Sequence, residues 1–219
     1  MRALPGPAVV FTVVVTAGLL LAVPAPSEAT QDAGAPSFQS PVSSPAGHGP
    51  ASLATADLDG DGQTDLVVPG ADGTLNVLLG NGSGFFPSLI SYSVGGTPTS
   101  VLVAALRTGG PPDLVVTTSD SVVTLLNTGS GSFVAGQTEP VGTAPSSVAS
   151  GDLDGNGTTD LLTTNAGDDD VSVLLGDGTG GFTSQSPMSV GESPTGLDVG
   201  DFDGDGHLDT AVSNSGSNN

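Results

Sequence analysis

The sequence predicts an all-β fold, a β-propeller of four-stranded blades with one repeat of about 48 residues per blade, here an incomplete ring. Three markers recur with one shared period: the Asp that closes an acidic loop, a Phe and a Pro. They are Asp65, Asp113, Asp160 and Asp209; Phe38, Phe85, Phe133 and Phe182; and Pro50, Pro98, Pro145 and Pro194. Because the three markers are independent, their spacings of 47 to 49 residues indicate a true repeat array.

Each repeat also contains four short strand-like segments, separated by turns rich in Gly, Asp, Asn and Ser. The first is small and semi-apolar, the second follows the closing Asp, the third is apolar and the fourth begins at the recurring Phe. In the third repeat they span 147–151, 161–163, 171–175 and 182–190. The expected organisation is a signal peptide (1–29), an N-terminal segment with a lone outer strand (30–50), blade 1 (51–97), blade 2 (98–144), blade 3 (145–193) and a partial blade 4 (194–219).

Both ends of the array are expected to be partial blades. The segment from Phe38 to Pro50 resembles a fourth strand and its following turn, and a lone terminal strand often completes the last blade of a closed propeller. Residues 210–219 match a second strand and then stop. These strands do not divide into complete four-stranded blades, so we expect further blades to be needed for a closed ring.

The loop between the first and second segments carries the chemistry. It reads Asp-x-Asp-Gly-Asp-Gly-x-x-Asp at 57–65 and 201–209, and at 152–160 Asn replaces the third acidic residue. Alternate side chains of such a turn point inward, and the glycine at position 6 permits a sharp bend. Calcium takes about six to eight oxygen ligands. Three such loops therefore predict calcium sites.

Two other kinds of loop are also rich in Asp and Gly. Asp and Gly also favour plain surface turns, but turn chemistry does not require acidic residues repeatedly at positions 1, 3, 5 and 9. The helix–loop–helix calcium hand needs Glu at position 12. That position holds Val68, Thr163 or Val212, and the residues after each loop are strand-like, so the helical hand is rejected.

The second repeat lacks this loop chemistry. Counted back from Asp113, positions 1, 3 and 5 are Ala105, Arg107 and Gly109. We expect no metal in this blade. Either Arg107 pairs with Asp113 in place of the ion, or the loop is a plain degenerate turn.

Composition indicates an exported protein. Arg2, an apolar run from Ala8 to Val23 and small residues before Thr30 predict a secretory signal peptide, with an uncleaved anchor as the alternative. The chain has no Cys, so calcium would replace disulfides as the cross-link. Its net charge of −21 argues against nucleic acid or an anionic membrane surface as partner. We expect a secreted or cell-surface protein that does not insert into membranes after signal cleavage.

No residue pattern indicates catalysis, and we expect no enzyme activity from this chain. The only histidines are His48, in a Gly/Pro-rich turn, and His207, at an outward position of a calcium loop. Three functions remain: an extracellular module for adhesion or recognition of a protein or glycan, an accessory propeller of a larger exported enzyme, and a surface-structural array. Exposed Trp or Tyr would favour carbohydrate binding, and the chain has no Trp and one Tyr, Tyr92.

The loop motif, the apolar pair after it and the Gly-Phe after the third segment resemble the FG-GAP/VCBS repeat of integrin α chains and secreted bacterial proteins. The resemblance covers about Phe38 to Asn219 and implies a β-propeller, usually of seven blades, with calcium in blade loops. It implies side-chain ligands at positions 1, 3, 5 and 9 and a backbone carbonyl at position 7. These residues are Asp57, Asp59, Asp61, Gln63 and Asp65; Asp152, Asp154, Asn156, Thr158 and Asp160; and Asp201, Asp203, Asp205, His207 and Asp209. Because Asn156 lacks a charge, its site is expected to be weaker.

Overall fold

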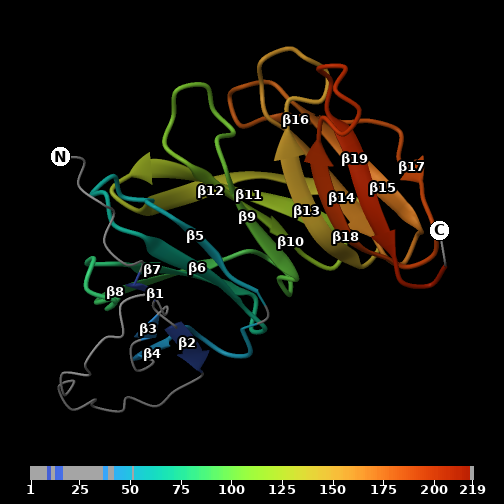
Figure 1. Ribbon diagram of the computed structural model, residues 1–219. Coiled ribbons are helices and arrows are strands. Elements are labelled where there is room, and N and C mark those ends of the chain that lie inside the picture. Colours follow the sequence, from blue (N-terminus) through green and yellow to red (C-terminus); the bar gives the residue numbers. More distant parts are fainter. Residues whose placement is uncertain (1–8, 11–12, 17–36, 39–41, 51, 218–219) are drawn as a thin grey trace.

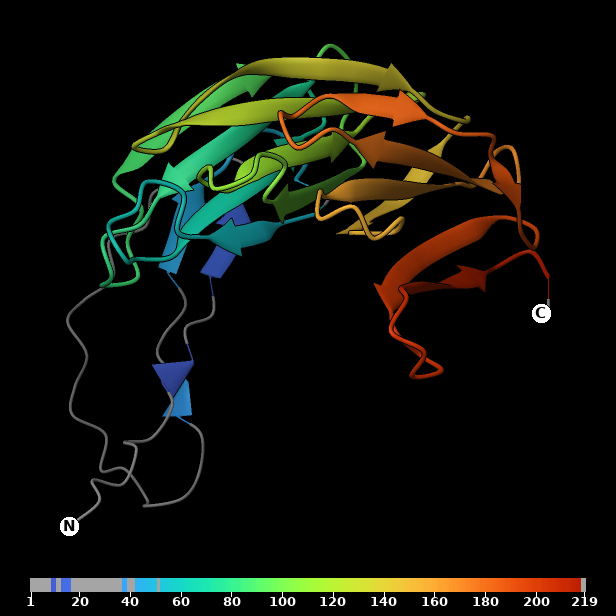
Figure 2. The ribbon, with the colours of Figure 1, turned by 90° about the horizontal axis from the view of Figure 1, so that it is seen from above.

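The computed structural model describes residues 9–10, 13–16, 37–38, 42–50 and 52–217, and every regular element in these ranges is a β-strand (Figure 1). Three antiparallel sheets and a two-stranded sheet follow one another along an open arc (Figure 2). The predicted all-β fold with four-stranded blades is confirmed, and the blades form an open arc rather than a closed ring.

Each of these sheets lies within one sequence repeat. Blade 1 contains β5 (Ala54–Ala56), β6 (Asp65–Gly70), β7 (Thr74–Leu79) and β8 (Ser88–Ser93). Blade 2 contains β9 (Ser100–Ala104), β10 (Asp113–Thr117), β11 (Ser121–Gly129) and β12 (Ser132–Pro140). Blade 3 contains β13 (Pro145–Gly151), β14 (Asp160–Asn165), β15 (Asp170–Gly176), β16 (Phe182–Ser184) and β17 (Met188–Ser189), and blade 4 contains β18 (Pro194–Gly200) and β19 (Asp209–Asn214).

The fourth strand differs in detail from the sequence expectation. In blade 1 it begins at Ser88, three residues after Phe85, and Phe85 itself is exposed. In blade 3 it is split into β16 and β17, which both pair with β15. The fourth strand lies at the edge of its sheet and pairs only with the third strand. Its exact course therefore depends on its neighbours more than on its own residues.

The core lies between adjacent blades. The second strands of blades 1 and 2, β6 and β10, are buried along their whole length, because their alternate side chains face different neighbours. Val67 and Leu75 of blade 1 pack against Leu114 and Val116 of blade 2. Val115 of blade 2 faces the other way and packs with Leu161 of blade 3. Blades thus stack face to face, each supplying half of an apolar interface.

A repeated hydroxyl group also joins the inner strands. Thr99 Oγ1, at the start of blade 2, donates to the carbonyl of Pro145 in blade 3 at 2.9 Å. Ser146 Oγ, one repeat later, donates to the carbonyl of Pro194 in blade 4 at 2.7 Å. The recurring Pro therefore marks the point where blades 3 and 4 each receive a hydrogen bond from the blade before.

The N-terminal segment forms two short parallel pairs. β1 (Val9–Val10) pairs with β3 (Ser37–Phe38), and β2 (Val13–Thr16) pairs with β4 (Val42–Pro45). Ala46, after β4, is buried against Leu66, Val68 and Leu78 on the outer face of blade 1. Most of the predicted signal peptide lies outside the described residues, and within those residues no helix is long and apolar enough to cross a membrane.

Candidate metal centres

The three acidic loops are built by hydrogen bonds from their own backbone to their side chains. In the first loop Asp57 accepts the Gly60 N–H on Oδ1 at 2.8 Å and the Gly62 N–H on Oδ2 at 2.9 Å. Asp201 makes the same pair with Gly204 and Gly206. The aspartate at position 1 thereby wraps the loop around its own carboxylate.

The glycines at positions 4 and 6 are required by backbone conformation. Gly60 and Gly62 have φ values of 81° and 82°, and the glycines of the other two loops match them. A Cβ at Gly60 or Gly62 would meet open space, so steric contact is not the reason for glycine here. The left-handed φ alone selects glycine, and it produces the predicted bend.

Each loop brings three carboxylates together. In each group one oxygen per residue lies within 4.8 Å of the others. The groups are Asp57, Asp59 and Asp61; Asp152, Asp154 and Asp160; and Asp201, Asp203 and Asp209. Three convergent anionic oxygens and no nitrogen or sulfur donor form a ligand set suited to a hard cation such as calcium.

The closing Asp has a structural role that the loop pattern does not reveal. Asp65 is fully buried and accepts the Leu58 N–H on Oδ2 and the Gly80 N–H on Oδ1, both at 2.8 Å. Asp160 makes the same two contacts with Leu153 and Gly176. This carboxylate therefore ties the start of the loop to the end of the third strand. Burial, together with the nearby charges of Asp59 and Asp61, raises the pKa of Asp65.

The residue at position 7 continues the turn. The backbone N–H groups of Gln63, Thr158 and His207 donate to the side-chain oxygen at position 5, at 2.7, 2.7 and 2.8 Å. These bonds hold Asp61, Asn156 and Asp205 in place. Coordination through the position 7 carbonyls stays a prediction.

Asn156 makes the loop of blade 3 different from the other two. Its Nδ2 donates to Asp154 Oδ2 at 3.0 Å. The amide therefore occupies a carboxylate oxygen that could otherwise bind a cation. It brings no negative charge of its own to the site.

The loop of blade 2 contains an ion pair instead of an acidic cluster. Arg107 Nη2 lies 2.6 Å from Asp113 Oδ1, and Arg107 Nε lies 3.2 Å from Oδ2. Arg107 Nη2 also donates to the carbonyl of Asn127 at 2.6 Å. Of the two interpretations of this loop, the one in which Arg107 pairs with Asp113 agrees with the structure.

Asn127 is a structural residue that sequence reasoning missed. It occupies the place of Gly80 and Gly176, and its N–H donates to Asp113 Oδ1 at 2.7 Å. Its Nδ2 donates to the carbonyl of Leu58 in the first acidic loop at 2.8 Å. A polar residue where the other repeats have glycine was the available signal. Asn127 therefore joins the loop of blade 2 to the first acidic loop.

Comparisons with known proteins agree with this architecture. Among curated proteins no significant match is found. Among solved structures, the chain is similar to BBS1N in complex with ARL6DN (16% identity, TM-score 0.53, 75% of this chain and 47% of that one). It is also similar to a Pseudomonas aeruginosa periplasmic gluconolactonase (22%, TM-score 0.51, 72% and 44%).

A third similar structure is an Agrocybe aegerita lectin that recognises non-reducing terminal N-acetylglucosamine (26% identity, TM-score 0.50, 72% of this chain and 45% of that one). The chain spans less than half of the length of each of these three proteins. Sequence models of the repeat match most of the blade region: the FG-GAP-like repeat matches residues 110–163 and 152–212, and the FG-GAP repeat matches residues 49–84. The chain therefore belongs to the FG-GAP repeat family.

Proposed function

We propose that this protein is an exported recognition module, extracellular or on the cell surface, whose propeller blades are stabilised by calcium. The observation that carries the proposal is the convergence of three carboxylates in each of three loops. The predicted signal peptide supports an exported location, and because an exported chain without Cys has no disulfides, calcium would take their place as the cross-link. The likeness to a lectin supports recognition, with a glycan or a protein as the partner.

Calcium has a structural role in this proposal. Each ion neutralises carboxylates that repel one another and fixes the turn between the first and second strands of its blade. Extracellular calcium modules bind with dissociation constants of about 10⁻⁴–10⁻³ M, and we expect affinities in that range.

The test is thermal unfolding of the protein in millimolar calcium and in excess chelator. Asp59→Asn and Asp203→Asn are the informative variants, because Oδ1 of each residue accepts one backbone N–H, at 3.1 and 3.0 Å, which an Asn side chain can still accept. The turn is retained while one ligand charge is lost. Glu192→Gln, which removes an exposed charge outside the loops, is the matched control.

We expect calcium to raise the melting temperature of the wild-type protein and of Glu192→Gln by equal amounts, and to raise those of the two loop variants less. If the wild-type protein melts at the same temperature in calcium and in chelator, the loops are acidic turns that bind no stabilising calcium. Magnesium should raise the melting temperature of the wild-type protein less than calcium does, because magnesium demands a tighter octahedral ligand set.

A further inference from the structure

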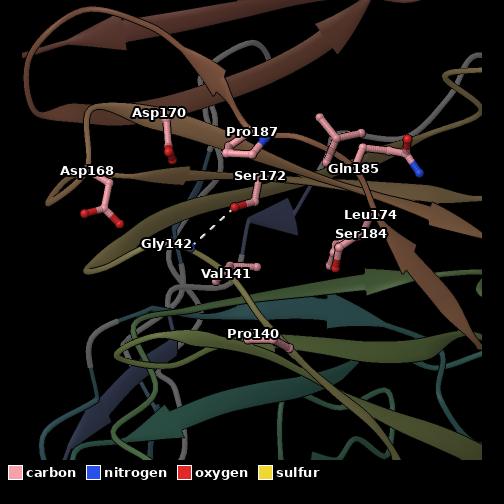
Figure 3. A pocket seen from close by; sticks show the side chains of 11 residues that line it. Pro140, Val141, Gly142, Asp168, Asp170, Ser172, Leu174, Ser184, Gln185 and Pro187 are labelled. Carbon is pink, nitrogen blue, oxygen red and sulfur yellow. Dashed lines mark hydrogen bonds between the residues drawn. The ribbon is translucent and has the colours of Figure 1, made fainter.

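A cleft of about 290 Å³ lies between blades 2 and 3, away from the acidic loops (Figure 3). One wall is the connection from β12 to β13, with Pro140, Val141 and Gly142, and the other is the face of β15. The segment between β16 and β17 closes the side with Gln185 and Pro187. Small-molecule sites occupy roughly 300–1,000 Å³, so this cleft has room for a ligand of about one sugar residue.

A buried amide that does not itself line the cleft holds two of its polar lining residues, Asp170 and Ser172. Asn165 is fully buried, and its Nδ2 donates to Asp170 Oδ1 at 2.6 Å and to Ser172 Oγ at 2.9 Å. Ser172 Oγ also accepts the Gly142 N–H at 3.4 Å. Gly142 must be glycine here, because a Cβ would lie 2.7 Å from the Asn165 side chain.

The cleft itself is lined by hydrogen-bond acceptors. Asp168 and Asp170 contribute carboxylates and Ser172 contributes a hydroxyl group. Asp170 uses Oδ1 for Asn165, and within the described residues no hydrogen bond is made to its Oδ2. The cleft therefore favours a ligand that brings hydroxyl donors.

The corresponding interface between blades 1 and 2 is apolar. Thr118 stands at the place of Asn165, and Val123 at the place of Ser172. Val123 packs beside Val94, which is buried and corresponds to Val141. The same place in blade 1 is polar again, because Asn76 replaces Ser172 there and its Nδ2 donates to the carbonyl of Ala46 at 3.1 Å. The polar group in the cleft is therefore missing from blade 2 but is not particular to blade 3.

The charge of the cleft restricts its ligand. Asp168, at the mouth, is held by Thr143, whose N–H donates to Oδ2 at 2.6 Å and whose Oγ1 donates to Oδ1 at 2.9 Å. Two carboxylates, Asp168 and Asp170, disfavour phosphates and acidic sugars. Pro140, Val141 and Pro187 offer an apolar surface to the C–H face of a sugar ring in place of an aromatic side chain.

We propose that this cleft binds one neutral pyranose residue of a glycan, with hydroxyl groups donating to Asp170 and Ser172 and with Ser184 and Gln185 at its rim. The inference rests on the recognition function proposed above and gives it a site and a ligand class. The alternative ligand for this acidic cleft is a cationic side chain of a protein partner.

The probes are N-acetylglucosamine, glucose, galactose and mannose, measured by saturation-transfer NMR and by titration calorimetry on the full chain. A tetralysine peptide tests the cationic alternative. Asp170→Asn keeps an acceptor for Asn165 but removes the charge, and Gln185→Ala changes only the exposed rim. Ser172→Val introduces the side chain of blade 2, and Glu192→Gln is the matched charge control.

We expect at least one sugar to bind the wild type and Glu192→Gln equally, and the affinity to fall at least tenfold in Asp170→Asn and Ser172→Val and severalfold in Gln185→Ala. No sugar binding to folded wild-type protein overturns the proposal, and so does binding that all three cleft variants retain. Binding of tetralysine without any sugar also overturns it.

The same samples are melted with calcium and with chelator. A calcium shift without sugar binding rejects the cleft and leaves the calcium-stabilised module intact. Sugar binding that depends on Asp170, without a calcium shift, supports the cleft and rejects the calcium role.

Discussion

Arg107 binds both carboxylate oxygens of Asp113, with its Nη2 2.6 Å from Oδ1 and its Nε 3.2 Å from Oδ2. Asp113 is fully buried, and the side chain of Arg107 is 28% exposed. The same closing carboxylate stands in the other three repeats, where the described part of the chain gives it no basic partner. The guanidinium thus supplies, in blade 2, a fixed positive charge where a cation is proposed for the acidic loops.

Arg107→Ala is expected to destabilise the protein by about 1–3 kcal/mol, because it leaves a buried carboxylate and the Asn127 carbonyl short of a donor. The loss should be the same in calcium and in chelator, since blade 2 lacks the acidic set. Urea unfolding in both conditions measures it. Arg107→Lys keeps the charge but not the paired geometry, and we expect it to restore only part of the loss.

Asn156→Asp is expected to tighten calcium binding at the loop of blade 3 severalfold. It adds a ligand charge and removes the amide that occupies Asp154 Oδ2. In chelator the variant should be less stable than the wild type, because the loop then holds four aspartates and has lost the amide that donates to Asp154. Calcium titration by calorimetry tests the first expectation, and thermal unfolding in chelator tests the second.

Asn81→Asp is the control for that experiment. Asn81 lies in a turn outside the acidic loops, where its Oδ1 accepts the N–H and the hydroxyl of Ser83. The variant adds the same charge without adding a ligand. A gain in calcium affinity from Asn81→Asp equal to that from Asn156→Asp would show a general charge effect and would count against the loop.

Asp177 gives a pH-dependent prediction. The Thr179 hydroxyl and the Thr179 and Gly181 N–H groups all donate to its Oδ1 and lower its pKa below the ordinary 3.8. A carboxylate with a lowered folded pKa stabilises the protein above its unfolded pKa, and this contribution is lost as the pH falls through the folded value. Asp177→Asn should therefore lose less stability than the wild type between pH 5 and pH 2.

The measurement for Asp177 is urea unfolding across that pH range, in chelator. Asn81 occupies the same kind of turn in blade 1 and shows that an amide can hold it. At pH 7 we expect the variant to be slightly less stable, because an uncharged acceptor makes weaker hydrogen bonds. Parallel pH profiles for the variant and the wild type would contradict the assignment.

The fold and the loops could be predicted because their determinants are local. The glycines at positions 4 and 6, the alternating aspartates and the apolar pair after the loop lie within a dozen residues, and the period repeats them. The second function of Asp65 could not be predicted this way. Its partner Gly80 lies fifteen residues away, and the contact exists only once the third strand has returned beside the loop.

The cleft between blades 2 and 3 could not be predicted from the sequence either. Asn165, Ser172 and Gly142 come from three different segments, and each is an ordinary strand or turn residue on its own. The pairing of Arg107 with Asp113 could be predicted only in part. The charge and position of Arg107 favoured it, but a plain degenerate turn was equally consistent with the sequence.

The hydroxyl groups between blades provide a test of how blades are coupled. Ser146 Oγ donates to the Pro194 carbonyl of blade 4 at 2.7 Å and lies 2.9 Å from Thr164 Oγ1. Ser146→Ala is expected to cost about 1 kcal/mol in the free energy of unfolding, the net value of a hydrogen bond in a protein. It should also speed hydrogen exchange in blade 4, because the bond joins that blade to blade 3.

Thr195→Ala is the matched control, since Thr195 holds the position of Ser146 in blade 4. Its hydroxyl contacts only Ser213 of its own blade, at 3.3 to 3.4 Å, and it is exposed. We expect Thr195→Ala to change stability by less than about 0.5 kcal/mol, as surface substitutions do. Equal losses from the two variants would mean that the hydroxyl acts within its own blade, and that apolar packing alone couples one blade to the next.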